Sequence, residues 1–167
     1  MKRVDEVVLP LKEAIRRGSL AVVGMGNRDR ADDGLGLDLA ERLKDRRSGL
    51  VFSEEERGVE GIVFDLIERD DVDTVVFVDA ANFGGQTGEL RLFDVHDAER
   101  FIPSFSTHKV PITLLMGLVD QKGKTPYLLG VQPKDTTLFS PMTSIVASRL
   151  DDLIRVFLEP AGSKRTG

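Results

Sequence analysis

The chain contains no cysteine, and only two of its 167 residues are histidine. Without cysteine, disulfides, thiolate nucleophiles and cysteine-ligated zinc sites are excluded. Long apolar runs are also missing, since no stretch approaches the roughly 18 apolar residues of a membrane-spanning helix. The first residues, MKRVDEVVLP, are too charged for a signal peptide. We therefore expect a cytoplasmic protein that does not insert into membranes.

An excess of positive charge is absent as well. The 23 lysines and arginines are outnumbered by 28 acids, so the net charge is −5 and nucleic acid is not an expected partner. The 41% apolar and 31% charged content is typical of a globular protein, and the length fits one domain of roughly 100–200 residues. We expect a single α/β domain over residues 1–160 and a flexible tail over residues 161–167.

Apolar periodicity predicts alternating helices and strands. The spacing predicts helices over residues 4–17, 33–46, 59–69, 112–119 and 144–158, and strands over residues 20–23, 50–52, 74–81, 90–95 and 126–133. This alternation predicts a three-layer α/β sandwich, in which helices cover both faces of a mostly parallel twisted sheet. In such sheets ligands bind beyond the carboxyl ends of the strands.

The glycine-rich stretch GMGNRDRADDGLG, residues 24–36, follows the first predicted strand. Gly24 and Gly26 match two positions of the dinucleotide-binding fingerprint, but Asp29 occupies the third, and no P-loop ending is present. The loop carries three acids and two arginines: Asp29, Asp32, Asp33, Arg28 and Arg30. The acids would repel a pyrophosphate and the arginines offset only part of their charge, so a nucleotide-binding domain is the third-ranked alternative.

Two carboxylates and one imidazole form a candidate cation site. Asp33 alone would have an ordinary role at a helix start, whereas Asp79 ends a buried strand, where a carboxylate needs a cation or donors. His108 lies in a polar loop before a helix. Such a set suits Zn, Ni, Mn or Fe and leaves coordination positions open. His96 is expected to be solvent-exposed.

The remaining polar residues give weaker signals. Asp29 and Asp32 are expected to have capping and solvation roles rather than to bind a metal. No serine lies in a G-x-S-x-G nucleophile elbow, so the residues favour metal-assisted hydrolysis over acyl-enzyme chemistry.

Five segments together carry a family resemblance. In order, they are VVGMGNRDRADDGLG, VVFVDAANFGGQTGEL, STHKVPI, LLGVQP and FSPMTSIV. Their order and spacing resemble those of the [NiFe]-hydrogenase maturation endopeptidases, from about Leu20 to Leu158. GVQP followed by SPMT is similar to the branch that matures membrane-bound, hydrogen-evolving enzymes.

This resemblance implies an activity and a set of site residues. The family removes a C-terminal extension from the hydrogenase large-subunit precursor after nickel insertion, and Asp33, Asp79 and His108 match its three nickel-recognition ligands. Nickel would then be supplied by the precursor, and Zn, Cd or Ni bound to isolated protein would be a surrogate. The resemblance identifies no catalytic group, and the candidates are Asp33, Asp79, His108 and Glu56. We expect a monomer that associates transiently with the precursor.

One segment departs from the family pattern. Where the family has D-G-G-[ST]-x-G, this chain has ERGVEG, residues 56–61, which keeps an acid at Glu56 but replaces the first glycine by Arg57 and the hydroxyl residue by Val59. The departure puts the choice of substrate in doubt more than the fold. Two alternatives stay open: a nickel-sensing maturation chaperone that does not cut, and a metallopeptidase with its own zinc.

Overall fold

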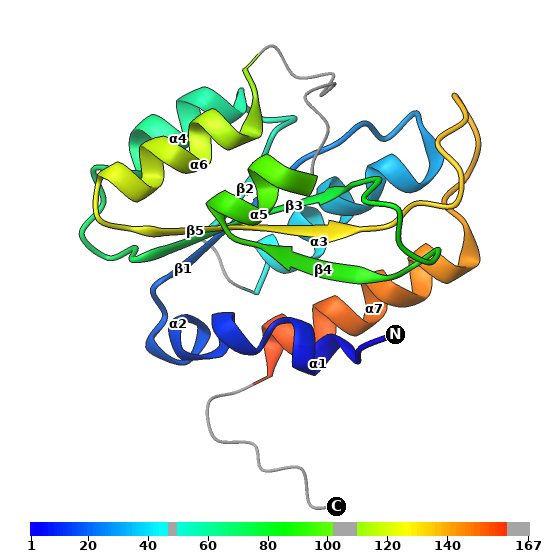
Figure 1. The fold of residues 1–167 in the computed structure, drawn as a ribbon, viewed down its shortest axis with the longest axis horizontal. Helices are drawn as coiled ribbons and strands as arrows, with labels where there is room; N and C mark the ends of the chain where they lie inside the picture. The colour runs from blue at the N-terminus through cyan, green and yellow to red at the C-terminus, as the bar shows by residue number, and fades with distance from the viewer. Residues whose placement is uncertain (47–49, 102–109, 160–167) are drawn as a thin grey trace, which may run out of the picture.

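A computed structural model describes residues 1–46, 50–101 and 110–159 (Figure 1). Five strands form one sheet in the order β2-β1-β3-β5-β4. They are β1 (Leu20–Gly24), β2 (Val51–Ser53), β3 (Thr74–Ala80), β4 (Leu90–Phe93) and β5 (Thr125–Val131). All neighbouring strands are parallel except β4, which runs antiparallel to β5 at one edge. The predicted tail, residues 161–167, lies outside the described residues.

Helices cover both faces of the sheet, which confirms the predicted three-layer α/β fold. One face packs against α1 (Val4–Val7), α2 (Lys12–Arg17), α3 (Leu35–Lys44) and α7 (Ser144–Leu158). The other packs against α4 (Val59–Leu66), α5 (Val95–Phe101) and α6 (Ile112–Gln121). In Figure 1, α4 and α6 lie above the sheet, and α1, α2 and α7 below it. Within the described ranges, no helix is long and apolar enough to cross a bilayer.

The central strands are buried on both faces, as their continuous apolar sequences predict. In β3, residues 75–78 are fully buried, and successive side chains enter opposite cores, Val76 with α3 and α7, Phe77 with α4 and α6. The parallel register aligns Gly24 with Val78, and Asp79 with Gly130. The carboxyl ends of β1, β3 and β5 therefore meet at one edge, where ligands of such sheets bind.

Two regions differ from the sequence prediction. The single helix expected over residues 4–17 is divided into α1, a 3-10 turn at Leu9–Leu11 and α2, because Pro10 has no N–H to donate within a helix. Helix α5 was not predicted, because it is short and the strand predicted over residues 90–95, which ends at Phe93 in the structure, includes its first residue.

Helix α3 begins in direct backbone contact with the sheet. A Cβ on Gly36 would lie 2.2 Å from the Val78 carbonyl oxygen and 2.3 Å from that of Met25. A Cβ on Gly24 would lie 2.1 Å from the Gly36 carbonyl oxygen. Only glycine allows this approach, which places the start of α3 beside the ends of β1 and β3.

We therefore predict opposite effects for two helical glycine-to-alanine changes. Gly36→Ala should lower the free energy of unfolding by about 2–3 kcal/mol, because the new methyl group meets backbone atoms that cannot move aside. Gly117→Ala in α6 is the matched control, since a Cβ there would meet nothing within 4 Å, and it should raise the free energy by about 0.5–1 kcal/mol. Urea denaturation measures both; equal effects would contradict the close approach.

Candidate functional site

The loop after β1 brings Asp33 beside the end of β3. The two meet at Gly26, which has a φ of +135°, a conformation that favours glycine. A Cβ on Gly26 would lie 2.0 Å from the carbonyl oxygen of Asp33 and 3.3 Å from Oδ1 of Asp79. Oδ1 of Asp79 is shielded from solvent. The backbone of Asp33 and the carboxylate of Asp79 thus border one glycine at the carboxyl edge of the sheet, while the role of both residues in binding stays a prediction.

A third acid, Glu54, reaches the same glycine from β2. Its Oε2 accepts a hydrogen bond of 2.9 Å from the Gly26 N–H, and its own N–H donates to the Gly24 carbonyl oxygen at 3.0 Å. The sequence interpretation missed Glu54. A signal was available, because Glu54 directly follows a strand that pairs with β1, just as Asp79 ends the strand on its other side.

Asp32, the residue before Asp33, is fully buried and holds the loop in place. Its carboxylate accepts hydrogen bonds of 2.8–3.0 Å from the N–H groups of Lys134, Asp135 and Thr143, and from the Thr143 hydroxyl. The expectation of a solvated Asp32 is therefore wrong. The Asp32 carboxylate thus joins the loop after β1 to the segment between β5 and α7. The backbone N–H of Asp32 adds a hydrogen bond to the Asp135 carbonyl oxygen.

Arg28, in the loop after β1, forms ion pairs with α3 and with the turn after β2. Its guanidinium pairs with Glu55 at 2.7 Å, Asp38 at 2.5 Å and Glu41 at 2.9 Å. The hydrogen bond to Glu55 is the main cause that raises the pKa of Arg28 above its ordinary value. These three acids therefore hold the Arg28 guanidinium at the rim of the loop.

The divergent segment after β2 lies at the surface and begins α4. The candidate Glu56 is exposed and pairs with Lys44 of α3. Arg57 pairs with Asp65 at 2.5 Å and donates to the Gly61 carbonyl oxygen at 2.9 Å. Glu56 and Arg57 are therefore both engaged in surface ion pairs. The acid of this region that contacts Gly26 is Glu54, not Glu56.

The two histidines have different standing. His96 is exposed at the start of α5, as expected. His108, the predicted third ligand, lies in residues 102–109, outside the described residues. Within residues 1–46, 50–101 and 110–159, no three His, Asp or Glu side chains form a group that could hold a metal ion. The described acids thus supply at most part of a coordination sphere.

Comparison with known proteins gives a consistent match. The family model HycI, hydrogenase maturation protease, matches residues 59–159, more than half of the chain. The crystal structure of a [NiFe] hydrogenase maturation protease HycI from Thermococcus kodakarensis is 29% identical, with a TM-score of 0.70 over 83% of this chain and 89% of its own.

Two further relatives agree. The solution structure of an endopeptidase HycI from Escherichia coli shares the fold, with a TM-score of 0.67 over 86% of this chain and 94% of its own, at 23% identity. A Methanocaldococcus jannaschii protein, provisionally named a hydrogenase maturation protease, is 24% identical over 86% of this chain and 97% of its own length.

The Asp32 contacts lead to a stability prediction. Asp32→Asn should lower the free energy of unfolding by about 2–3 kcal/mol, because an amide NH₂ would face buried N–H donors and leave them without an acceptor. The control is Asp29→Asn in the same loop, where an exposed carboxylate should change the value by less than about 0.5 kcal/mol. Thermal or urea unfolding measures both, and an unaffected Asp32→Asn protein would show that the carboxylate does not hold the loop.

Proposed function

The chain belongs to the hydrogenase maturation protease family, whose members are endopeptidases that process the hydrogenase large-subunit precursor. We therefore propose that it removes a C-terminal extension from a [NiFe]-hydrogenase precursor after nickel insertion. In this proposal Asp33, Asp79 and His108 recognise the nickel that the precursor already carries. The metal is then part of the substrate, and the enzyme acts as a monomer that binds the loaded precursor transiently.

A single observation supports this proposal most strongly: the backbone carbonyl of Asp33 and the carboxylate of Asp79 both border Gly26, so the two residues lie at the same edge of the sheet. The two acids come from different elements, 46 positions apart, and meet where parallel α/β sheets bind ligands. Carboxylates at such an edge attract a divalent cation through its charge. The nickel of the precursor would be that cation, and His108 would complete the set.

The donor set fits nickel chemically. Carboxylates and imidazole are ligands that borderline divalent ions accept, and three protein donors leave positions for ligands that belong to the precursor. Nickel so held would supply a Lewis acid close to the scissile region. Asp33 and Asp79 would orient the loaded centre, and a precursor without nickel would lack the ion that they bind. The enzyme would thus discriminate by the binding energy that the nickel contributes.

The source of the metal can be tested directly. Chelator-treated enzyme, freed of chelator, should cleave a nickel-loaded precursor and leave an unloaded one intact, because the required ion comes with the substrate. Mass spectrometry of the large subunit measures the loss of the extension. If cleavage returned only after zinc was added to the enzyme, the protein would be a zinc metallopeptidase; binding without any mass change would identify a chaperone that does not cut.

The three proposed ligands can be tested individually. Asp33→Ala, Asp79→Ala and His108→Ala should each slow processing about 100-fold or more, since the loss of one ligand weakens recognition by roughly 3 kcal/mol. Asp29→Ala is the matched control, because it removes an exposed acid of the same loop and should retain near-native rates. Circular dichroism checks that each variant is folded. A variant that processes normally would remove that residue from the proposed set.

A further inference from the structure

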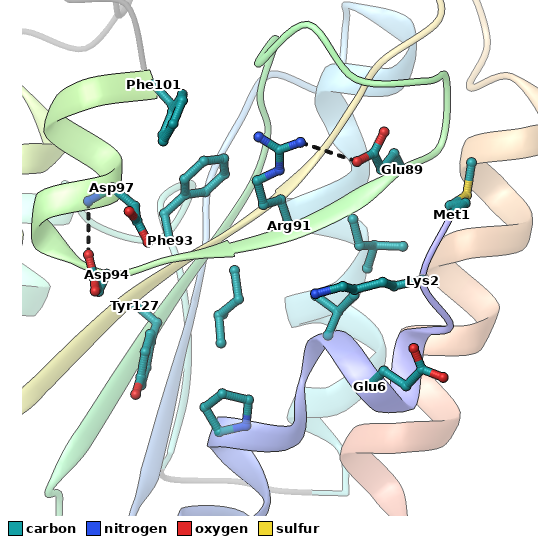
Figure 2. Close-up of a pocket in the computed structure, with 14 residues that line it drawn as sticks. Met1, Lys2, Glu6, Glu89, Arg91, Phe93, Asp94, Asp97, Phe101 and Tyr127 are labelled. Carbon is teal, nitrogen blue, oxygen red and sulfur yellow. Dashed lines mark hydrogen bonds and ion pairs between the residues drawn. The ribbon is translucent and has the colours of Figure 1, made fainter.

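A groove follows the edge of the sheet at β4, which has no partner strand on its outer side among the described residues. Figure 2 shows its walls, with α5 on one side and α1 on the other, and the edge of β4 between them. Its volume is about 880 Å³, which lies in the range of roughly 300–1,000 Å³ for ligand-binding clefts. None of the acids that border Gly26 lines this groove.

The outer edge of β4 presents backbone groups for a further strand. The carbonyl oxygen of Glu89, the residue before β4, accepts a hydrogen bond of 2.8 Å from the N–H of Gln132, the residue after β5. Because backbone groups alternate in direction along an antiparallel strand, Arg91 and Phe93 also face β5, whereas Leu90 and Leu92 turn their N–H and C=O groups outward. In the described part of the chain, β5 is the only strand that pairs with β4.

The same edge is connected in register to the candidate site. Asp79 of β3 aligns with Gly130 of β5, which in turn aligns with Arg91 of β4. A strand added outside β4 would lie three strand spacings, roughly 14 Å, from Asp79. Since an extended chain advances about 3.3 Å per residue, four or five residues would bridge the added strand and Asp79.

The side chains of the groove favour a peptide with basic residues. Arg91 lies over the ring of Phe83 at 4.7 Å and pairs with Glu89 at 3.3 Å. A hydrogen bond from the Gln86 N–H lowers the pKa of Glu89, which keeps that carboxylate charged. The remaining charged side chains of the lining are three acids and one lysine: Glu6, Asp94, Asp97 and Lys2. The N-terminal ammonium of Met1 also lines the groove, so with Glu89 and Arg91 the lining carries four negative and three positive charges, a surplus of one negative charge.

We propose that the outer edge of β4 binds an extended, basic segment of the precursor as a sixth strand of the sheet. Strand addition to an open edge gives affinity through main-chain hydrogen bonds, and flanking side chains give specificity. The inference rests on the proposed function, because its occupant is the chain that the enzyme cleaves. It adds a docking site for residues about five positions from the scissile bond.

A synthetic peptide tests strand addition on the unmodified protein. A fluorescein-labelled heptapeptide of alternating lysine and valine should bind, as measured by fluorescence anisotropy, and its fully N-methylated version should bind at least tenfold more weakly, because it cannot donate main-chain hydrogen bonds. Equal binding of the two peptides, or no binding of either, would overturn the inference. So would a concentration-dependent dimer in sedimentation that excludes the peptide, because a second copy would then occupy the edge.

A matched pair of variants locates the binding edge. Leu92→Pro removes the outward N–H, which edge strands tolerate, and Leu92→Ala removes the same side chain but keeps that N–H. The proline variant should bind the peptide at least tenfold more weakly than the alanine variant, and its KM for the nickel-loaded precursor should be raised more than its kcat is lowered. Equal affinities would overturn the inference.

The two proposals fail in different ways. If cleavage depends on nickel but the peptide does not bind at β4, the docking inference is wrong and the proposed function stands. If the peptide binds β4 as described but cleavage does not depend on nickel in the precursor, the nickel-recognition proposal is wrong.

Discussion

The close backbone contact between α3 and the sheet is the constraint on which the candidate site depends. Gly36 approaches the carbonyl oxygens of Met25 and Val78 so closely that a side chain could not fit. The start of α3 is therefore held at the ends of β1 and β3. The chain must consequently reverse its direction in the short loop between β1 and α3. Gly26 makes that reversal possible through its positive φ. The glycines of this loop thus serve a backbone-packing role, not that of a phosphate cradle.

Two adjacent acids in this turn have different surroundings. Asp32 is fully buried among N–H and hydroxyl donors, and these donors stabilise its carboxylate. Asp33, one residue later, is only partly buried and borders Gly26. Because the first acid holds the loop against the segment before α7, the second is kept at the edge of the sheet. A rigid support of this kind is what a recognition site requires.

The sequence was sufficient for the elements with strong periodic patterns. Helix α7 begins and ends at the predicted residues, and β3 is one residue shorter than predicted, since a long amphipathic stripe and a continuous β-branched run have few competing interpretations. The surroundings of Asp32 and Glu54 could not be predicted in the same way. Their partners come from other strands and loops, and local patterns do not encode which distant backbone N–H groups a carboxylate will meet.

The Asp32 contacts also determine when the site can form during folding. Its partners lie 102, 103 and 111 positions further along the chain, so these hydrogen bonds close some of the longest loops in the molecule. The entropy lost in closing such loops is recovered only after β1, β3 and β5 have paired. The turn that carries Asp33 is therefore ordered late, when the C-terminal third of the chain is in place. A partly synthesised chain has the glycines and the acids of this turn but lacks the residues that hold Asp32 in place.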